Sequence, residues 1–225
     1  MHRLECDGWA RVHAHALHLS RTCQNYCIRY SGYERSQIPC PSPGVGGYCL
    51  TKDPLLASWA KQNLINSMNP LQMSESAVKI NDKMPEFAFN FLESFFENGI
   101  ENLNVCLLGV SYLSDVGDTR YTPVELLYKC LNNAGCKMEL HDPYVSFWEE
   151  LNIPVNNDIS ILDKDYDILI FSTGHTVYKS NSALIKAIMK KDKVFILDTI
   201  GILSADEILE LSSKHTVKVI GRGDI

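Results

Sequence analysis

Short apolar runs alternate with amphipathic helical stretches along the second half of the chain, from Asn104 onward. These segments fall at residues 105–108, 122–132, 137–140, 168–171, 182–189, 194–197, 205–211 and 217–220. Strands that alternate with helices form a parallel sheet with helices on both faces. We therefore predict an α/β chain in which residues 100–225 fold as a Rossmann-like parallel-sheet domain.

Two amphipathic helices are predicted ahead of the sheet, at residues 53–66 and 74–98, the second with a kink at Pro85. An aromatic stripe is more often internal core, yet in so short a chain these helices have little else to bury against. We expect residues 34–99 to form a helical central region that self-associates. The apolar positions are Leu55, Leu56, Trp59, Ala60, Leu64 and Ile65, then Ala77, Ile80, Met84, Phe87, Phe91, Leu92, Phe95 and Phe96.

Composition is that of an ordinary soluble globular chain, with 45% hydrophobic residues, 21% charged residues and a net charge of −6. There is no basic stripe of the kind that a phosphate backbone requires, so we predict no nucleic-acid partner. The longest apolar runs, such as 168–171 and 194–197, are far too short to span a bilayer, so we predict no membrane partner. A cytoplasmic location is predicted because the N-terminus lacks a basic region followed by an apolar signal core. Eight cysteines in this length fit reduced thiols.

Residues 41–53 place Cys49 at the end of a turn that contains Gly44, Gly46 and Gly47, with Lys52 and Asp53 shortly after it. Glycines allow a close approach of backbone to ligand, and their amides can face negative charge that develops beside a thiol. A cysteine at a helix N-terminus tends toward the reactive thiolate form. The pattern suits a nucleophile, but a short glycine motif of this kind is more often a plain turn with Cys49 buried as a small apolar residue.

A second segment, from Gly109 to Arg120, directly follows the first predicted strand of the sheet. Parallel sheets bind ligands at the carboxyl ends of their strands, so a site is expected there. From the pattern alone, Asp115 and Asp118 could instead be ordinary turn and helix-cap residues.

Taken together, the motifs resemble one family. The order is Gly-Gly-x-Cys-x-x-Lys-Asp, then Asn81-Asp82, then Gly-x-x-Tyr-x-x-Asp-x-x-Asp-Thr-Arg, then Asp-Pro-Tyr at 142–144. This order resembles the UDP-glucose/GDP-mannose dehydrogenase family, from about Arg35 to the C-terminus. The likeness covers the family's central helical region and its C-terminal nucleotide-sugar domain. It does not cover the family's N-terminal NAD-binding Rossmann domain, because Gly44 to Gly47 lack the strand and the acidic residue of a dinucleotide fingerprint.

The resemblance implies a role for individual residues. Cys49 would attack the substrate aldehyde, Asp53 would help to activate the hydrolytic water, and Lys52 would line the sugar beside them. Substrate contacts would come from Arg35, reaching a neighbouring subunit's substrate, and from Gly44, Gly46, Gly47 and Tyr112. Arg120 would reach the NAD side of the cleft.

The implied reaction is a four-electron oxidation of a sugar C6 alcohol to a carboxylate with two NAD molecules, through a thiohemiacetal and a thioester on Cys49. The implied partners are a nucleotide sugar, of UDP type, and a second copy of the chain in a homodimer, in polysaccharide biosynthesis. Without the nicotinamide domain we expect a fragment that is inactive alone. A module that binds a nucleotide sugar without chemistry and a dimerisation remnant without ligand remain the alternatives.

Two positions depart from the family pattern: Leu113 stands where a lysine is usual, and Asp198-Thr199-Ile200 lacks the arginine of an Asp-x-Arg segment. Residues 1–33 also depart, because they contain no Lys-x3-Asn. We assign them no fold, and a poorly packed segment or an aberrant reading frame would explain them equally. Their Cys-x3-Cys and His-x-His-x2-His lack the spacing of a structural zinc site, so we predict no metal.

Overall fold

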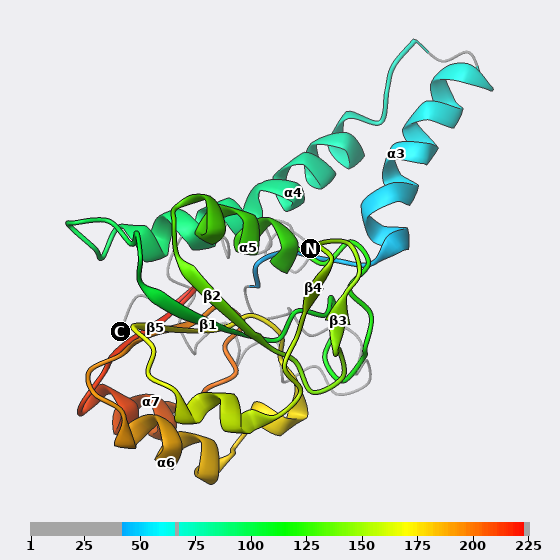
Figure 1. Cartoon of the computed structure of the whole chain (residues 1–225). Helices are drawn as coiled ribbons and strands as arrows, with labels where there is room; N and C mark the ends of the chain where they lie inside the picture. Colours follow the sequence, from blue (N-terminus) through cyan, green and yellow to red (C-terminus); the bar gives the residue numbers. More distant parts are fainter. Residues whose placement is uncertain (1–41, 66–67, 223–225) are drawn as a thin grey trace, which may run out of the picture.

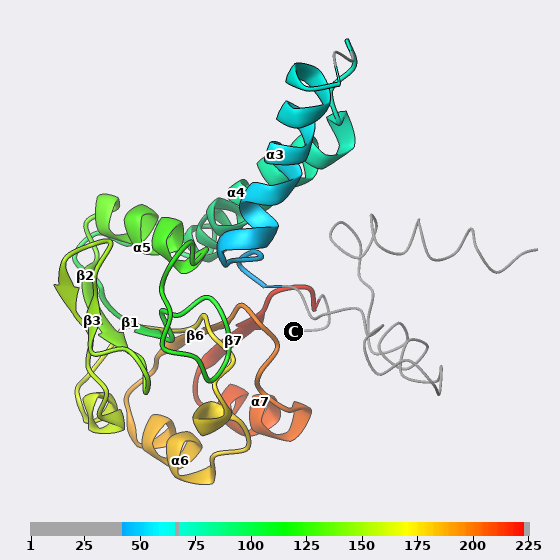
Figure 2. The ribbon, with the colours of Figure 1, turned by 90° about the vertical axis from the view of Figure 1, so that its right-hand side faces the viewer.

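A helical hairpin projects from a parallel-sheet domain (Figures 1 and 2). The structure is a computed structural model, and it describes residues 42–65 and 68–222. The hairpin consists of α3 (Tyr48–Asn63) and α4 (Gln72–Glu93). Helix α4 packs against α3 and also against α5 (Val124–Asn133), so it joins the hairpin to the domain.

The described residues form a five-stranded sheet in the order β2-β1-β5-β6-β7, with every pair parallel. The predicted α/β fold with a parallel sheet is therefore confirmed. The strands are β1 (Asn104–Leu108), β2 (Lys137–His141), β5 (Ile168–Phe171), β6 (Phe195–Asp198) and β7 (Thr216–Val219).

Helices cover both faces of this sheet. Helix α5 and the C-terminal part of α4 lie over one face, while α6 (Ser182–Lys190) and α7 (Ala205–Ser212) lie under the other (Figure 1). Strand β5 shows how its sequence builds both layers: Ile168 and Ile170 join the core beneath α5, and Leu169 and Phe171 join the core above α6 and α7. This follows from the two-residue period of a strand, and it explains why β5 is apolar throughout.

The bounds of both helices differ from those expected, because α3 begins five residues early and α4 ends at Glu93 rather than near Asn98. Helix α3 begins at Tyr48 rather than at Asp53, so Pro54 lies inside the helix and not at its first position. The start is set by Gly47, whose φ of 86° ends the preceding turn, and by the Thr51 hydroxyl, which donates to the Gly47 carbonyl at 2.8 Å. Pro85 lies inside α4, as expected.

The apolar residues of the hairpin remain largely exposed. Of the predicted positions, only Leu92 is fully buried, within the core that α4 and α5 share. Large apolar side chains that are at least 41% exposed on or just beyond the two helices are Tyr48, Leu50, Leu55, Leu56, Trp59, Leu64, Ile65, Met68, Met73, Ile80, Phe87 and Phe95.

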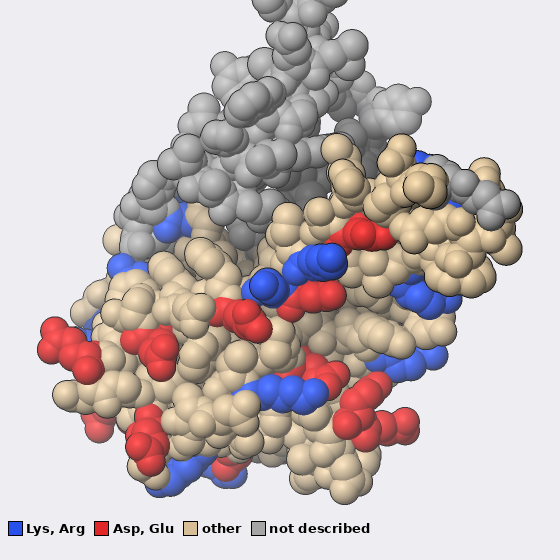
Figure 3. Space-filling view, turned by 90° about the horizontal axis from the view of Figure 1, so that it is seen from above, with Lys and Arg blue, Asp and Glu red and all other residues tan. Residues whose placement is uncertain are grey.

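Several short elements were not predicted. A two-stranded antiparallel hairpin of β3 (Phe147–Trp148) and β4 (Ile153–Pro154) follows β2, and two short 3-10 helices, η1 (Ile159–Asp163) and η2 (Thr176–Tyr178), flank β5. Seen from above, acidic and basic side chains are interspersed on the surface (Figure 3). Within the described ranges, no helix combines the length and the apolar character that crossing a bilayer would need.

Candidate functional site

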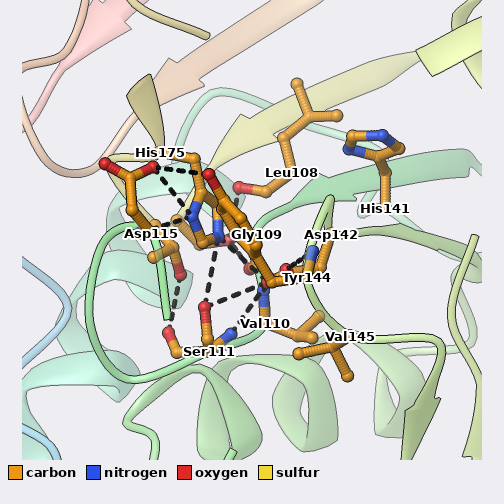
Figure 4. A network of polar contacts seen from close by, with 12 residues as sticks. Leu108, Gly109, Val110, Ser111, Asp115, His141, Asp142, Tyr144, Val145 and His175 are labelled. Carbon is orange, nitrogen blue, oxygen red and sulfur yellow. Dashed lines mark hydrogen bonds and ion pairs between the residues drawn. The ribbon is translucent and has the colours of Figure 1, made fainter. Parts of the chain in front are cut away.

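Loops from three neighbouring strands meet at the carboxyl edge of the sheet, and one buried carboxylate joins them (Figure 4). Asp142 follows β2, and its Oδ2 accepts the Val110 N–H at 2.9 Å and the Ser111 N–H at 3.1 Å, both from the loop after β1. The Ser111 hydroxyl also donates to this oxygen, at 3.1 Å. On the other carboxylate oxygen, Oδ1 accepts the Tyr144 N–H at 2.9 Å.

The loop after the third strand, β5, contains His175, which is fully buried. Its Nδ1 accepts the Asp115 N–H at 2.9 Å, so the proton of the neutral ring resides on Nε2, 3.0 Å from Asp142 Oδ2. Burial by itself would raise the pKa of Asp142, but hydrogen bonds from His175 and from the Val110 backbone outweigh burial. The pKa of this carboxyl therefore lies below its ordinary value.

Asp115, in the loop after β1, forms a second set of hydrogen bonds to the loops that follow β2 and β5. Its backbone is in the left-handed region, with φ of 59°, and its carboxylate accepts the Thr176 N–H at 2.8 Å, the Thr176 hydroxyl and the Tyr144 hydroxyl at 3.3 Å. The hydrogen bonds from Thr176 lower the pKa of Asp115. Asp115 is thus a clamp between the loops that follow β1 and β5.

Arg120, predicted to reach the cofactor, is paired at the surface. Its Nε lies 3.0 Å from Asp118 Oδ1 and its Nη2 lies 2.6 Å from Asp118 Oδ2, and its side chain is 71% exposed. This fork of hydrogen bonds lowers the pKa of Asp118. An incoming anion would have to compete with Asp118 for the guanidinium.

The glycine-rich turn packs directly on the loop that follows β1. The Gly47 N–H donates to the Tyr121 carbonyl at 3.2 Å. A Cβ on Gly46 would lie 2.7 Å from Tyr112 Cβ and 2.8 Å from the Tyr121 oxygen, while a Cβ on Gly47 would lie 3.0 Å from the Tyr112 ring. Any larger residue would separate the two segments, so these glycines permit a close approach of protein to protein.

Helix α4 holds the other side of the glycine turn. The Val45 N–H donates to Asn81 Oδ1 at 2.7 Å, and Asn81 Nδ2 donates to the Val45 carbonyl at 2.8 Å. Gly44 lies beneath this pair, because a Cβ there would be 3.4 Å from the Asn81 carbonyl and 3.1 Å from Pro123 Cβ. The turn is therefore fixed between α4 and the sheet domain.

The three predicted catalytic residues lie together at the start of α3. Cys49 is exposed in the first turn, so the interpretation of it as a buried apolar residue is wrong. Lys52 Nζ lies 3.5 Å from Asp53 Oδ1, and both side chains are exposed. Arg35 lies outside the described residues.

The two positions that depart from the family pattern differ in their surroundings. Leu113 is 52% exposed in the loop after β1. Ile200 is partly buried against the core that α6 and α7 cover, where Asp198 accepts the N–H groups of Ile200 at 3.1 Å and Leu203 at 2.9 Å. Burial raises the pKa of Asp198.

Sequence reasoning missed His175 and Ser111 as partners of Asp142. A signal was available, because the polar run Ser172 to His175 follows the apolar strand β5 at the edge where a site was expected. Within the described residues, no three His, Cys, Asp or Glu side chains are grouped so as to hold a metal ion. The cysteines and histidines of residues 1–33 lie outside that range.

The residues described do not fit NAD. Strand β1 is followed by Gly109-Val110-Ser111 rather than by a Gly-x-Gly-x-x-Gly turn into a helix, and Arg120 is engaged with Asp118. No hydride-transfer step is assigned to these residues.

A parallel-sheet domain with polar loops gathered at its carboxyl edge has the architecture of a nucleotide-binding domain. Residues 106–205 match the family model described as UDP-glucose/GDP-mannose dehydrogenase family, UDP binding domain. Residues 106–205 therefore belong to the UDP-binding domain of that family, as the sequence motifs predicted.

Relatives and solved structures agree with this assignment. The chain is 33% identical over 149 residues to a UDP-N-acetyl-D-mannosamine dehydrogenase of Methanococcus aeolicus, a match that covers 66% of this chain and 32% of the relative. It is 28% identical over 202 residues to the enzyme of that name from Methanococcus maripaludis, covering 85% of this chain and 42% of the relative. The chain therefore spans less than half the length of these curated relatives.

Among solved structures, an NDP-N-acetyl-D-galactosaminuronic acid dehydrogenase of Methanosarcina mazei Go1 superposes with a TM-score of 0.77 at 23% identity. This superposition covers 96% of this chain and 47% of the other. At this level of identity it supports the fold.

Proposed function

We propose that this chain binds a nucleotide sugar of UDP type at the carboxyl edge of its sheet and presents Cys49 to the sugar, as part of a nucleotide-sugar dehydrogenase. One observation carries the proposal. The Gly47 N–H donates to the Tyr121 carbonyl at 3.2 Å, so the turn that leads into Cys49 lies against the loop of the UDP-binding domain. The contact of this turn with the nucleotide loop suits one ligand that reaches from the loop to the thiol beyond the turn.

In this proposal each predicted residue keeps its role. Cys49 is the nucleophile, Asp53 assists the hydrolytic water and Lys52 contacts the sugar. Gly44, Gly46, Gly47 and Tyr112 shape the wall between thiol and nucleotide, Arg120 contributes a cation on the cofactor side, and Arg35 reaches a neighbouring subunit's substrate. NAD would accept the hydride at residues other than those described, and the activity belongs to the cytoplasm.

We propose three segments along the chain, with the roles given above. Residues 1–33 have no assigned role, residues 34–99 form the central helical region with the cysteine loop, and residues 100–225 form the UDP-sugar-binding domain. Relatives named as acting on UDP-N-acetyl-D-mannosamine support a UDP-sugar as the ligand.

Titration of UDP into the purified chain by calorimetry tests the binding proposal. Amide hydrogen exchange measured with and without UDP locates the site. Protection is expected at residues 109–122, in the loop after β1, and not in α7, which contributes no residue to the proposed site. Absence of heat and of protection, in a chain that unfolds cooperatively, would refute the proposal.

A non-catalytic module is the second candidate, and one observation favours it. Leu113 is 52% exposed where the family usually has a lysine, and Ile200 packs toward the core, so the expected site lacks two cations for a diphosphate. Such a module would hold a nucleotide sugar without turnover, or would serve dimerisation alone.

We also propose a homodimer through α3 and α4, whose exposed apolar side chains support it. Phe87 is 61% exposed. Burying that remainder is worth about 1.2 kcal/mol per copy, and a two-fold interface contains two copies, so Phe87→Ser should weaken the dimer by about 50-fold. Light scattering at micromolar concentration measures the mass.

Leu209→Ser is the matched control for the dimer, because Leu209 is 75% exposed on α7, away from the hairpin. A monomeric wild-type chain, or equal weakening by both variants, would refute the hairpin as the interface.

A further inference from the structure

Tyr121 has a backbone conformation that tyrosine rarely adopts. Its φ is 54°, in the left-handed region where the Cβ of an L-residue crowds its own backbone. The residue is tightly flanked, because the Thr122 N–H donates to the Thr119 carbonyl at 3.2 Å. Strain of this kind persists only where surrounding contacts impose it, and it marks positions worth examining for function.

The unusual conformation directs two groups of Tyr121 toward α3. Its carbonyl accepts the Gly47 N–H at 3.2 Å, immediately before the first residue of that helix. Its ring meets the Tyr48 ring edge-on, with centroids 5.3 Å apart and planes at 68°. This edge-to-face geometry is the favourable arrangement for two aromatic rings.

The contact continues along α3. Lys52 Nζ lies 4.3 Å from the centroid of the Tyr48 ring, a cation–π distance, and one turn separates the two residues. Cys49 directly follows Tyr48, in the same turn. Tyr121, Tyr48 and Lys52 therefore form a continuous series of side-chain contacts, called the stack below, which begins in the UDP-binding domain and ends at the proposed sugar-binding lysine.

We propose that Tyr121 is a positioning residue that fixes the first turn of α3, and with it Cys49 and Lys52, relative to the loop Gly109–Arg120. What this turn does chemically rests on the proposed function, whereas the mechanical connection rests on the contacts alone. A nucleotide that orders the loop would, through Tyr121, also order the turn that carries the thiol.

Amide hydrogen exchange of residues 47–52, measured without ligand on the full chain, tests the connection. Tyr121→Gly removes the ring and also relieves the left-handed strain, so the two effects on the free energy of unfolding should largely offset each other. Exchange at residues 47–52 should nevertheless become about fivefold faster, the size expected for loss of one aromatic pair. Tyr121→Phe keeps the ring and should restore wild-type exchange.

Leu209→Ala serves as the control, because this exposed residue of α7 has no part in the stack. Unchanged exchange at 47–52 in Tyr121→Gly, or equal acceleration in Tyr121→Phe, overturns the proposal. A local effect that Phe reverses, with an unchanged unfolding midpoint, supports positioning rather than general stabilisation.

A second arm adds UDP. Protection should extend to residues 47–52 in wild type and in Tyr121→Phe but stop at the nucleotide loop in Tyr121→Gly, and equal transmission in all three overturns the coupling. If UDP binds none of them, the proposed function fails, while the ligand-free arm still decides whether Tyr121 holds the turn.

Discussion

Replacing Leu113 by lysine should tighten UDP binding. Leu113 lies in the loop after β1, four residues beyond Gly109, and it is 52% exposed. Its carbonyl oxygen lies 3.3 Å from the Ser111 hydroxyl oxygen, which donates its proton to Asp142, so the backbone there lies next to the buried Asp142 network. A lysine at this position extends a flexible ammonium from a fixed backbone toward a diphosphate.

The expected size follows from the chemistry of the pair. A hydrogen bond to a charged group is worth about 1.5–3 kcal/mol, and partial exposure places this one at the low end, about 1.5 kcal/mol. That corresponds to an affinity gain of about tenfold. The gain should shrink with added salt, because the Debye length falls from about 10 Å at 0.1 M to about 3 Å at 1 M.

Calorimetric titration of UDP against wild type, Leu113→Lys and Leu209→Lys decides the matter. Leu209→Lys adds the same charge on α7, at a residue that is 75% exposed, so it controls for overall charge. Neither change should shift the unfolding midpoint, since both side chains are exposed. Equal gains in the two variants, or no gain at 113 in a chain that binds UDP, would refute the placement of the diphosphate.

Three further outcomes are expected. Peptide mapping after alkylation at pH 7 should show Cys49 reacting far faster than Cys106, because Cys49 is exposed whereas burial raises the pKa of the Cys106 thiol to about 12; equal rates would contradict this. The folded-state pKa of Asp142 lies below its ordinary 3.8, so the stability that its carboxylate contributes is fully present above pH 3.8 and is lost as the pH falls further. Urea unfolding at a series of pH values should therefore show a smaller loss of unfolding free energy in acid for Asp142→Asn than for wild type, and an equal loss in both would count against this. The 225-residue chain should not reduce NAD with any nucleotide sugar, because its described residues provide no dinucleotide turn, and turnover above background in an absorbance assay would disprove this.

Strands β1, β5 and β6 could be predicted because each consists mainly of a compact apolar run. Strand β5 was predicted with its observed bounds, 168–171, since all four residues are buried between two layers and need no knowledge of their neighbours. Tertiary contacts caused the error at α3. The helix was expected to begin at Asp53, but it begins at Tyr48, directly after Gly47, whose N–H donates to the carbonyl of Tyr121, 74 positions away.

The candidate site was predictable in part for the same reason. Cys49, Lys52 and Asp53 are close in sequence, so their spacing alone places them in neighbouring turns. The link between Asp142 and His175 spans 33 positions, and no local pattern encodes it. The glycines were predicted to lie close to a ligand, whereas in the structure they lie close to Tyr112 and Tyr121. A glycine-rich pattern shows that something approaches the backbone closely, but it does not show whether that is a ligand or another part of the protein.

The position of the Cys49 turn relative to the nucleotide loop depends on helix α4 as well as on the contact between Gly47 and Tyr121. Ala88 and Leu92 of α4 lie in the same buried core as Val105 of β1, so the C-terminal part of α4 is fixed to the sheet. Asn81 lies two turns earlier on that helix and holds Val45 through two hydrogen bonds of 2.7 and 2.8 Å. The glycine turn is therefore positioned from the sheet by two routes, through α4 and through Tyr121. Because both routes begin in the sheet domain, a ligand bound at its carboxyl edge would meet Cys49 at a position that this domain itself determines.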